Sequence, residues 1–121
     1  MSTRNTTLVI DREWAKEHPE GFAVNPEEVI EHSYVNMYIH HDGYLKWQGV
    51  QLANWIEWHF NEFAGYNKND GSRMASKLVH DFYYDSCYLY STKPDQIDAN
   101  YTYIIWTGKA DIWISCWDNY T

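Results

Sequence analysis

The sequence has few cysteines and lacks the short motifs that identify common enzyme classes. Only Cys87 and Cys116 are present, and their separation matches no zinc or redox motif, which predicts free, buried thiols in a reducing compartment. A glycine-rich phosphate loop, a His-Glu-x-x-His pair and a Gly-x-Ser-x-Gly elbow are all missing. These absences favour a protein that is not an enzyme, and we expect no cofactor.

Long hydrophobic runs are also missing. Leu8-Val9-Ile10 is the apolar run near the N-terminus, and it is too short for the core of a signal peptide. No other segment is long and apolar enough to span a membrane. We therefore expect an intracellular, cytoplasmic protein.

Basic residues are scarce: 9 Lys and Arg stand against 17 Asp and Glu, which gives a formal net charge of −8. This charge disfavours direct binding to a nucleic-acid backbone and favours a basic protein as partner. The acidity is concentrated between Asp11 and Glu31. The candidate contact residues in that stretch are Glu13, Glu17, Glu27, Glu28 and Glu31. The alternative is that these carboxylates are the solvated faces of ordinary helices.

Aromatic residues are the abundant class, at 18% of the chain, with 7 Trp, 11 Tyr and 4 Phe. A length of 121 residues fits one domain, which we place over residues 1–121 with 1–5 frayed. Much of the core of such a domain must be aromatic.

Start and stop signals outline the first half of the chain. Thr6–Ile10 reads as an edge strand, and Asp11 caps a short helix that ends at Pro19-Glu20-Gly21. Asn25-Pro26-Glu27-Glu28 has the pattern of a capping box, which predicts a helix that runs from there to about His41. The alternative for its second half is a hairpin that turns at Asp42-Gly43.

Two further helices and a C-terminal hairpin complete the expected fold. Apolar stripes predict helices over Val50–Ala64 and from Ser72, as N-cap, to Phe82. Tyr84–Tyr90 is strand-like, and Tyr101–Trp117 reads as two strands joined at Gly108-Lys109. The predicted class is α+β, with N-terminal helices packed on a short antiparallel sheet that ends in the β-hairpin.

The hairpin carries the main candidate contact surface. Pairing Thr107 with Ala110 places Tyr101, Tyr103, Ile105, Ile112, Ile114 and Cys116 on one apolar core face. Trp106, Trp113 and Trp117 then share the other face with small polar groups, which suggests a surface that binds a partner. Trp58, on the polar side of its helix, is a further candidate. The alternative is that helices cover these tryptophans.

Weak chemical signals remain. His40-His41-Asp42 could supply metal ligands or an acid/base pair if Glu57 or His59 approached, although adjacent histidines at a helix end more often compensate the helix dipole. His59 lies in an apolar stripe, where a hydrogen-bonded core histidine is expected. His80 and Asp81 lie away from the stripe and are expected to be solvated. Cys116 is expected to be a buried, inert thiol.

The main functional hypothesis is a non-catalytic inhibitor that occludes a basic surface of a nucleic-acid-binding enzyme or toxin, as phage anti-defence and immunity proteins do. Trp58, Trp106, Trp113 and Trp117 would be the anchors. The alternative is a small ligand-binding or hydrolytic domain whose aromatic pocket uses His40, His41 and Asp42. A third possibility is a structural subunit whose aromatic face is an oligomer contact.

Overall fold

A mixed sheet of five strands, in the order β3-β2-β1-β4-β5, organises the structure. The computed structural model describes residues 3–11, 13, 25–64, 70–84, 87–97, 99–108 and 112–118, with the backbone alone for 60–64. The elements are β1 (Asn5–Asp11), α2 (Pro26–Val29), the 3-10 turn η2 (Ile30–His32), β2 (Val35–Ile39), the π-helical turn η3 (Leu45–Gly49), α3 (Val50–Ala64), α4 (Gly71–Phe82), β3 (Cys87–Tyr90), the 3-10 turn η4 (Pro94–Gln96), β4 (Tyr101–Thr107) and β5 (Ile112–Asp118).

β1 lies at the centre of the sheet, so the prediction of an edge strand there is wrong. It pairs antiparallel with β2 and parallel with β4, from Asn5 beside Tyr101 to Asp11 beside Thr107. Leu8, Val9 and Ile10 are all fully buried. A continuous apolar run is typical of a strand covered on both faces. In a strand with one face exposed to solvent, apolar and polar residues alternate.

The predicted fold class is also wrong, because helices do not precede a purely antiparallel sheet. A strand opens the fold, the longer helices stand between β2 and β3, and the β1–β4 pair is parallel. Local sequence patterns identify individual elements but carry no information about a pairing between strands some ninety residues apart. The final hairpin is therefore only one edge of a larger mixed sheet.

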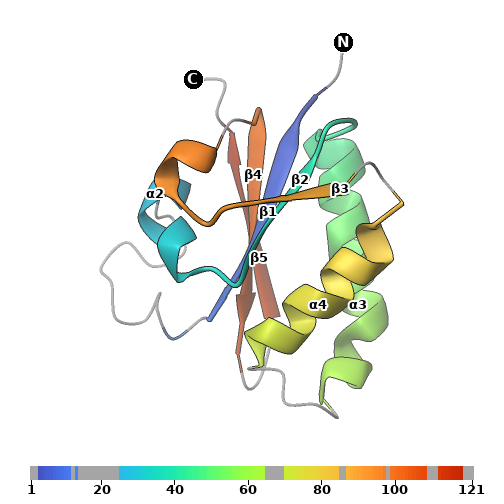
Figure 1. Cartoon of the computed structure of the whole chain (residues 1–121). Helices are drawn as coiled ribbons and strands as arrows, with labels where there is room; N and C mark the ends of the chain where they lie inside the picture. Colours follow the sequence, from blue (N-terminus) through green and yellow to red (C-terminus); the bar gives the residue numbers. More distant parts are fainter. Residues whose placement is uncertain are drawn as a thin grey trace.

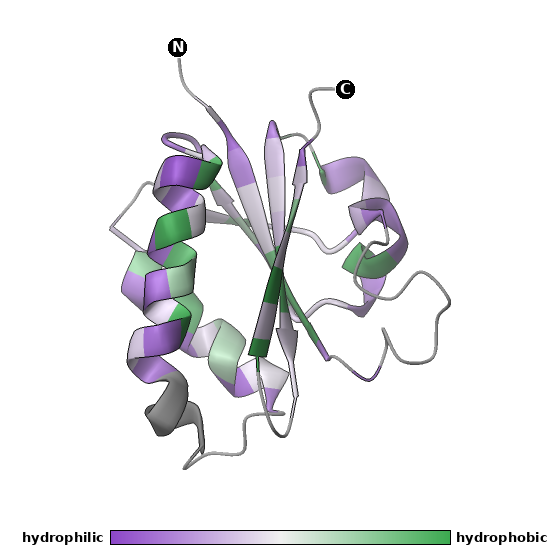
Figure 2. Ribbon diagram, turned by 180° about the vertical axis from the view of Figure 1, so that it is seen from behind, coloured by the Kyte–Doolittle hydropathy of each residue, from purple (hydrophilic) through white to green (hydrophobic). Residues whose placement is uncertain are grey.

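Helices cover both faces of the sheet (Figure 1). α3 and α4 pack on the face that carries Val9, Met37 and Ile105, and they contribute Leu52, Trp55, Met74, Leu78 and Phe82 to the main core. α2 and η2 cover the other face, where Leu8, Ile10, Val29, Ile30, Ile104 and Trp106 form a second core. Figure 2 views the sheet from the β5 side, between these two layers.

The Asn25 N-cap of the predicted capping box is confirmed, but the helix that it starts is short. Asn25 accepts a hydrogen bond from the Glu27 amide (2.9 Å), and Pro26 occupies the first turn. The prediction of a helix as far as His41 is wrong, because β2 begins at Val35. Alternate residues of β2 enter the main core. This is the two-residue period of a strand and not the 3.6-residue period of a helix. A turn does occur at Asp42-Gly43, but it leads into η3 rather than into a paired strand.

The two longer helices are confirmed. α3 has the predicted bounds, but α4 begins at Gly71 with Asp70 as its N-cap, so the prediction of Ser72 as N-cap is wrong. The Asp70 carboxylate accepts from the Ser72 hydroxyl (2.8 Å) and from the Arg73 amide (3.2 Å), and these hydrogen bonds lower its pKa. The short helix predicted after Asp11 lies outside the described residues. Within the described parts of the chain, no helix is long and apolar enough to cross a membrane.

The final hairpin has the predicted faces but a different register. Thr107 pairs with Ile112 and Tyr103 with Cys116, which is a shift of two residues from the predicted pairing. Side chains alternate with a period of two, so a shift of two leaves every residue on its predicted face. Trp106 consequently lies directly opposite Trp113.

Candidate functional site

Trp106 is buried and is removed from the predicted set of contact residues. It is fully inaccessible within the second core beneath α2 and η2, and its indole nitrogen donates to the Ser115 hydroxyl (2.9 Å). The predicted exposed face of the hairpin is therefore wrong for this residue, because α2 and η2 cover the middle of the sheet. The alternative, that a helix covers the tryptophan, is confirmed for Trp106 alone.

The other three predicted tryptophans are accessible but do not form one patch. Trp113 and Trp117 are 49% and 37% exposed on β5, on the α2 side of the sheet. Trp58 is 84% exposed on α3, which packs on the opposite face. Their role in binding stays a prediction, but the three tryptophans belong to two separate surfaces, one on β5 and one on α3.

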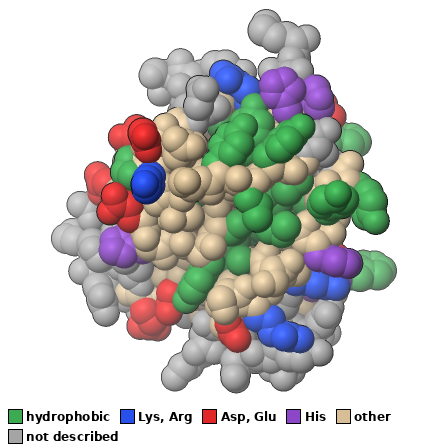
Figure 3. Space-filling model, in the orientation of Figure 1, with side chains coloured by type: hydrophobic (Ala, Val, Ile, Leu, Met, Phe, Trp, Pro, Cys, Tyr) green, Lys and Arg blue, Asp and Glu red, His purple; other side chains and the backbone are tan. Residues whose placement is uncertain are grey.

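The predicted acidic residues lie largely on one lobe. Glu27 and Glu28 are exposed in the first turn of α2, Glu31 is exposed in η2, and Asp95 of η4 joins them, since η4 packs on α2. Glu13 is also exposed, and Glu17 lies outside the described residues. Figure 3 shows acidic side chains gathered at the left, where Figure 1 places α2.

The predicted His40-His41-Asp42 cluster forms an exposed turn after β2. Asp42 adopts a left-handed backbone with φ of 57°, and Gly43 allows a close approach, since a Cβ there would lie 2.8 Å from Asn5 Cβ. The Tyr103 hydroxyl donates to the Gly43 carbonyl (2.6 Å). Burial raises the pKa of Tyr103 far above its ordinary value, which keeps this donor protonated. The buried Tyr103 hydroxyl thus fixes the backbone of this turn at Gly43.

This turn does not gather the groups that metal or acid/base chemistry would need. His40 Nδ1 lies 2.8 Å from the Tyr38 hydroxyl. His59, which the sequence offered as a possible neighbour of this cluster, lies beside Asp81 on α4. Among the described residues, no set of three or more His, Cys, Asp or Glu side chains is placed to hold a metal ion.

Asp81 joins α3 to α4, so the prediction that it is solvated is wrong. Its carboxylate accepts from the Trp55 indole (2.8 Å), and His59 Nε2 lies 3.4 Å away. Burial opposes ionisation, but hydrogen bonds from His80 and Trp55, with the charges of Lys77 and His59, outweigh it and lower the pKa of Asp81. His59 is a partly buried, partnered histidine, close to what its position in the stripe predicts.

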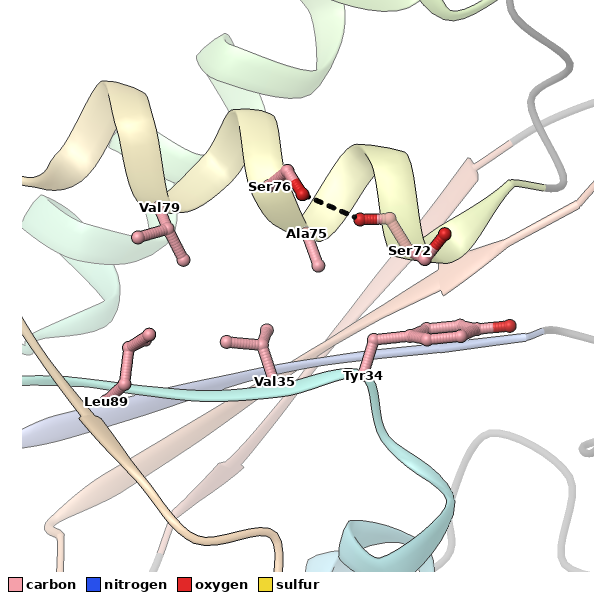
Figure 4. A pocket seen from close by; sticks show the side chains of 7 residues that line it. All are labelled: Tyr34, Val35, Ser72, Ala75, Ser76, Val79 and Leu89. Atoms are coloured by element: carbon pink, nitrogen blue, oxygen red, sulfur yellow. Dashed lines mark hydrogen bonds between the residues drawn. The ribbon is translucent and has the colours of Figure 1, made fainter.

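An apolar groove of about 450 Å³ lies between α4 and the β2–β3 corner of the sheet (Figure 4). One side of α4, with the helical spacing i, i+3, i+4 and i+7, supplies its upper wall as drawn. Val35, Leu89 and the Tyr34 ring supply the lower wall. The residues from α4 are Ser72, Ala75, Ser76 and Val79.

Local features explain why the groove stays open. β3 pairs with β2 over Asn36–Ile39, so its ladder stops one residue short of Val35. Gly71 begins α4 against the Tyr34 ring, at a point where a Cβ would collide with that ring. The ring therefore lies flat under the start of α4, as Figure 4 shows, and lines the groove instead of filling it.

Exposed aromatic side chains lie on the same edge of the sheet as this groove. Tyr83 and Tyr84 are exposed just after α4, and Leu89 is 58% exposed on β3. Tyr88 and Tyr90 are exposed on the opposite face of β3, where Tyr90 stacks on Tyr38 with ring centroids 4.8 Å apart. Figure 3 shows hydrophobic side chains across the centre of this view. We call the whole edge, that is the groove with Tyr83 and Tyr84 and the outer tyrosines Tyr88 and Tyr90, the β3 surface.

The β3 surface is not among the predicted sites. Its signal in the sequence is the density of large apolar residues in 83–90, beyond what one short strand buries. A strand prediction for that segment does not specify which of its faces is covered. Strand β3 exposes Leu89 on one face and Tyr88 on the other, because it is an edge strand that the helices cover only in part.

The two cysteines lie on opposite edges of the sheet. Both are free thiols, but Cys87 is half-buried and Cys116 is exposed, so the prediction of buried thiols is wrong. Desolvation of the sulfur raises the pKa of Cys116; the Tyr103 hydroxyl lowers it and Asp118 raises it again. Four strand spacings, about 19 Å, separate the edges, so the two cannot form a disulfide within one chain.

Comparisons of this chain with protein-family models, with curated proteins and with solved structures give no match.

Proposed function

We propose that this chain is a non-catalytic protein-binding domain that attaches to a basic partner through the β3 surface. The observation that carries the proposal is the open apolar groove, with the exposed Leu89 and Tyr34 at its mouth and further exposed tyrosines on the same edge of the sheet. Contiguous exposed apolar side chains beside polar ones are typical of protein contacts. A partner would insert an apolar side chain between α4 and Leu89.

Charge supports a basic partner. The protein carries a net charge of −8, and the exposed carboxylates of α2, η2 and η4 flank the aromatic centre in the view of Figure 3. Such an arrangement speeds the approach of a positive surface and disfavours acidic ones. Nuclease domains and other nucleic-acid-binding proteins present positive surfaces, so occlusion of one of them is the inhibitory activity we propose. Nucleic acid itself would be repelled.

The groove lining favours binding over hydrolysis. Its seven residues are Tyr34, Val35, Ser72, Ala75, Ser76, Val79 and Leu89, a set without His, Asp, Glu, Lys or Cys. General acid/base chemistry most often uses His, Asp, Glu or Lys, and Tyr34 is the one titratable side chain of this lining. His40, His41 and Asp42 lie on the turn after β2 and are not among these lining residues. We place the interaction in the cytoplasm, where free Cys87 and Cys116 would stay reduced.

Affinity capture from the lysate of the native host tests the proposal. The tagged protein is compared with Leu89→Ala, Trp113→Ala and Trp58→Ala, which truncate one exposed side chain on each of three surfaces. We expect one stoichiometric basic protein, retained at moderate salt by the wild type and lost with Leu89→Ala.

The two tryptophan variants are matched controls in this experiment. Retention of the partner by both supports the β3 surface. Loss with Trp113→Ala or Trp58→Ala, together with retention by Leu89→Ala, would move the binding site to β5 or α3. Near-ultraviolet circular dichroism of each variant checks that the fold is intact.

A further inference from the structure

β5 is the edge of the sheet opposite β3. It is seven residues long, Ile112–Asp118, and no strand that the structure describes pairs with its outer side. Natural edge strands are usually kept short or carry Lys, Pro or a bulge, because free backbone groups recruit other strands. β5 has no Lys, Arg, Pro or Gly, and its ladder with β4 is continuous from Ile112 to Asp118.

The sequence of β5 is nearly symmetric about its centre. Trp113 and Trp117 stand two residues on either side of Ser115, and Ile114 and Cys116 stand one residue on either side. A two-fold axis through Ser115 would therefore set each tryptophan opposite the other tryptophan of a second copy. Isologous contacts require this kind of self-complementarity.

We propose that β5 pairs antiparallel with β5 of a second copy of this chain, with the two-fold axis at Ser115. Trp113 then lies opposite the partner's Trp117, on the α2 side of a continuous sheet. Trp106 already pairs with Trp113 within each chain, so the indoles form a row of three on each side of the axis. Aromatic cross-strand pairs are among the more stabilising ones in sheets.

The charges permit this pairing despite the acidity of the chain. Asp118 is the one charged residue of β5, and the proposed register sets it opposite the partner's Ile112 instead of another carboxylate. The charge pattern is therefore compatible with the register that the tryptophans favour.

The surface area that this pairing would bury is small, so we expect a reversible dimer. The exposed 49% of Trp113 and 37% of Trp117 amount to roughly 200 Å² per copy, if a tryptophan offers about 250 Å². Adding the edge of a strand about 23 Å long leaves the interface below the roughly 1,200 Å² of a stable complex. We therefore expect dimers at high protein concentration and monomers on dilution.

Sedimentation equilibrium across a wide range of concentration tests the proposal. The mass should rise from 14.5 kDa towards twice that value as concentration increases. Trp113→Lys, which places a charge in the paired strand, should weaken association at least about tenfold, as edge lysines do. The matched variant Trp58→Lys should change it less than twofold. A constant monomer mass, or an equal loss with Trp58→Lys, would overturn the proposal.

Cross-linking tests the register and does not depend on Trp113→Lys being folded. Directly opposed residues of an antiparallel pair have Cβ atoms about 4.5–5.5 Å apart, close to disulfide geometry. Ser115→Cys, in a Cys116→Ser background, should form a disulfide-linked dimer under mild oxidation. Ser91→Cys in the same background, just beyond β3, should not. Equal cross-linking of the two variants, or none with Ser115→Cys, contradicts pairing about Ser115.

Discussion

β3 and β5 are the two edges of one sheet, and they differ in length, in neighbours and in exposed side chains. β3 has four residues, and Ser91-Thr92-Lys93-Pro94 follows it directly. The short length and the adjacent Lys and Pro make pairing of β3 with another strand less favourable. β5 has seven residues and contains no Lys, Pro or Gly. The groove lies beside β3, whereas β5 offers a longer edge that carries Trp113 and Trp117.

This difference indicates two kinds of contact. A short edge next to a groove binds through side chains, because it offers little backbone to pair, and its partner need not be a strand. A long regular edge binds through backbone hydrogen bonds, and a sequence symmetric about Ser115 fits a copy of itself. The predictions that follow separate the two edges, starting with the largest expected effect.

The largest effect is expected within the β5 hairpin itself, where two paired tryptophans have opposite environments. Trp106→Ala should lower the free energy of unfolding by about 3–5 kcal/mol, because it empties the second core. Trp113→Ala should cost only about half as much, because the residue is already 49% exposed to water in the folded state. Urea denaturation of the dilute monomer measures both. Similar losses for the two variants would show that the second core is not packed as described.

The next effect separates the edges by function. Leu89→Ala should weaken binding of the captured basic partner by about 2 kcal/mol, roughly 30-fold, because it removes one wall of the groove. The same change should leave self-association through β5 untouched. Isothermal titration calorimetry measures the affinity for the basic partner, and sedimentation measures self-association. A change in both would mean that the edges do not act independently.

A smaller effect is expected from the link between α3 and α4. Asp81→Asn should lower the free energy of unfolding by about 1–2 kcal/mol at neutral pH, because it weakens charge-assisted bonds to Trp55 and His80. The folded-state pKa of Asp81 lies below 3.8, so this stabilisation is present above that pH and disappears as the pH falls through the folded-state value. Denaturation at several pH values should show wild type and variant converging in acid. A difference independent of pH contradicts the role of the carboxylate charge.

The smallest effect concerns the thiol on β5. Because the pKa of Cys116 is raised, its alkylation at pH 8 should be slower than that of an unstructured cysteine peptide and should increase with pH beyond the usual range. The reaction should slow further as protein concentration increases, because pairing covers β5. Mass spectrometry of the Cys116 peptide provides the readout. If Cys116 is alkylated as fast as the peptide, its thiol is not desolvated and its pKa is not raised.

Local signals in the sequence identified most elements of the fold. The Asn25 cap, the bounds of α3 and the faces of the hairpin follow from side chains within a few residues of one another. The parallel pairing of β1 with β4 does not, because nothing near Leu8 encodes a partner in β4. That pairing makes β1 central, and it makes the predicted antiparallel sheet wrong.

The candidate sites were harder to predict, because exposure depends on which elements cover which strands. Trp106 and Trp113 have similar sequence surroundings, yet α2 and η2 bury the first and leave the second about half exposed. The groove beside Leu89 depends on the angle of α4 and on where β3 stops. Neither property has a local signal in the sequence.

Hydrogen–deuterium exchange of the backbone amides, measured at low and high protein concentration, tests the difference between the two edges most directly. Amides on the outer side of β5 should exchange more slowly at high concentration, because a second copy pairs with them, while those of Cys87–Tyr90 in β3 should not change. Exchange in β5 that is independent of concentration, or protection that increases equally at both edges, would contradict the assignment of self-pairing to β5.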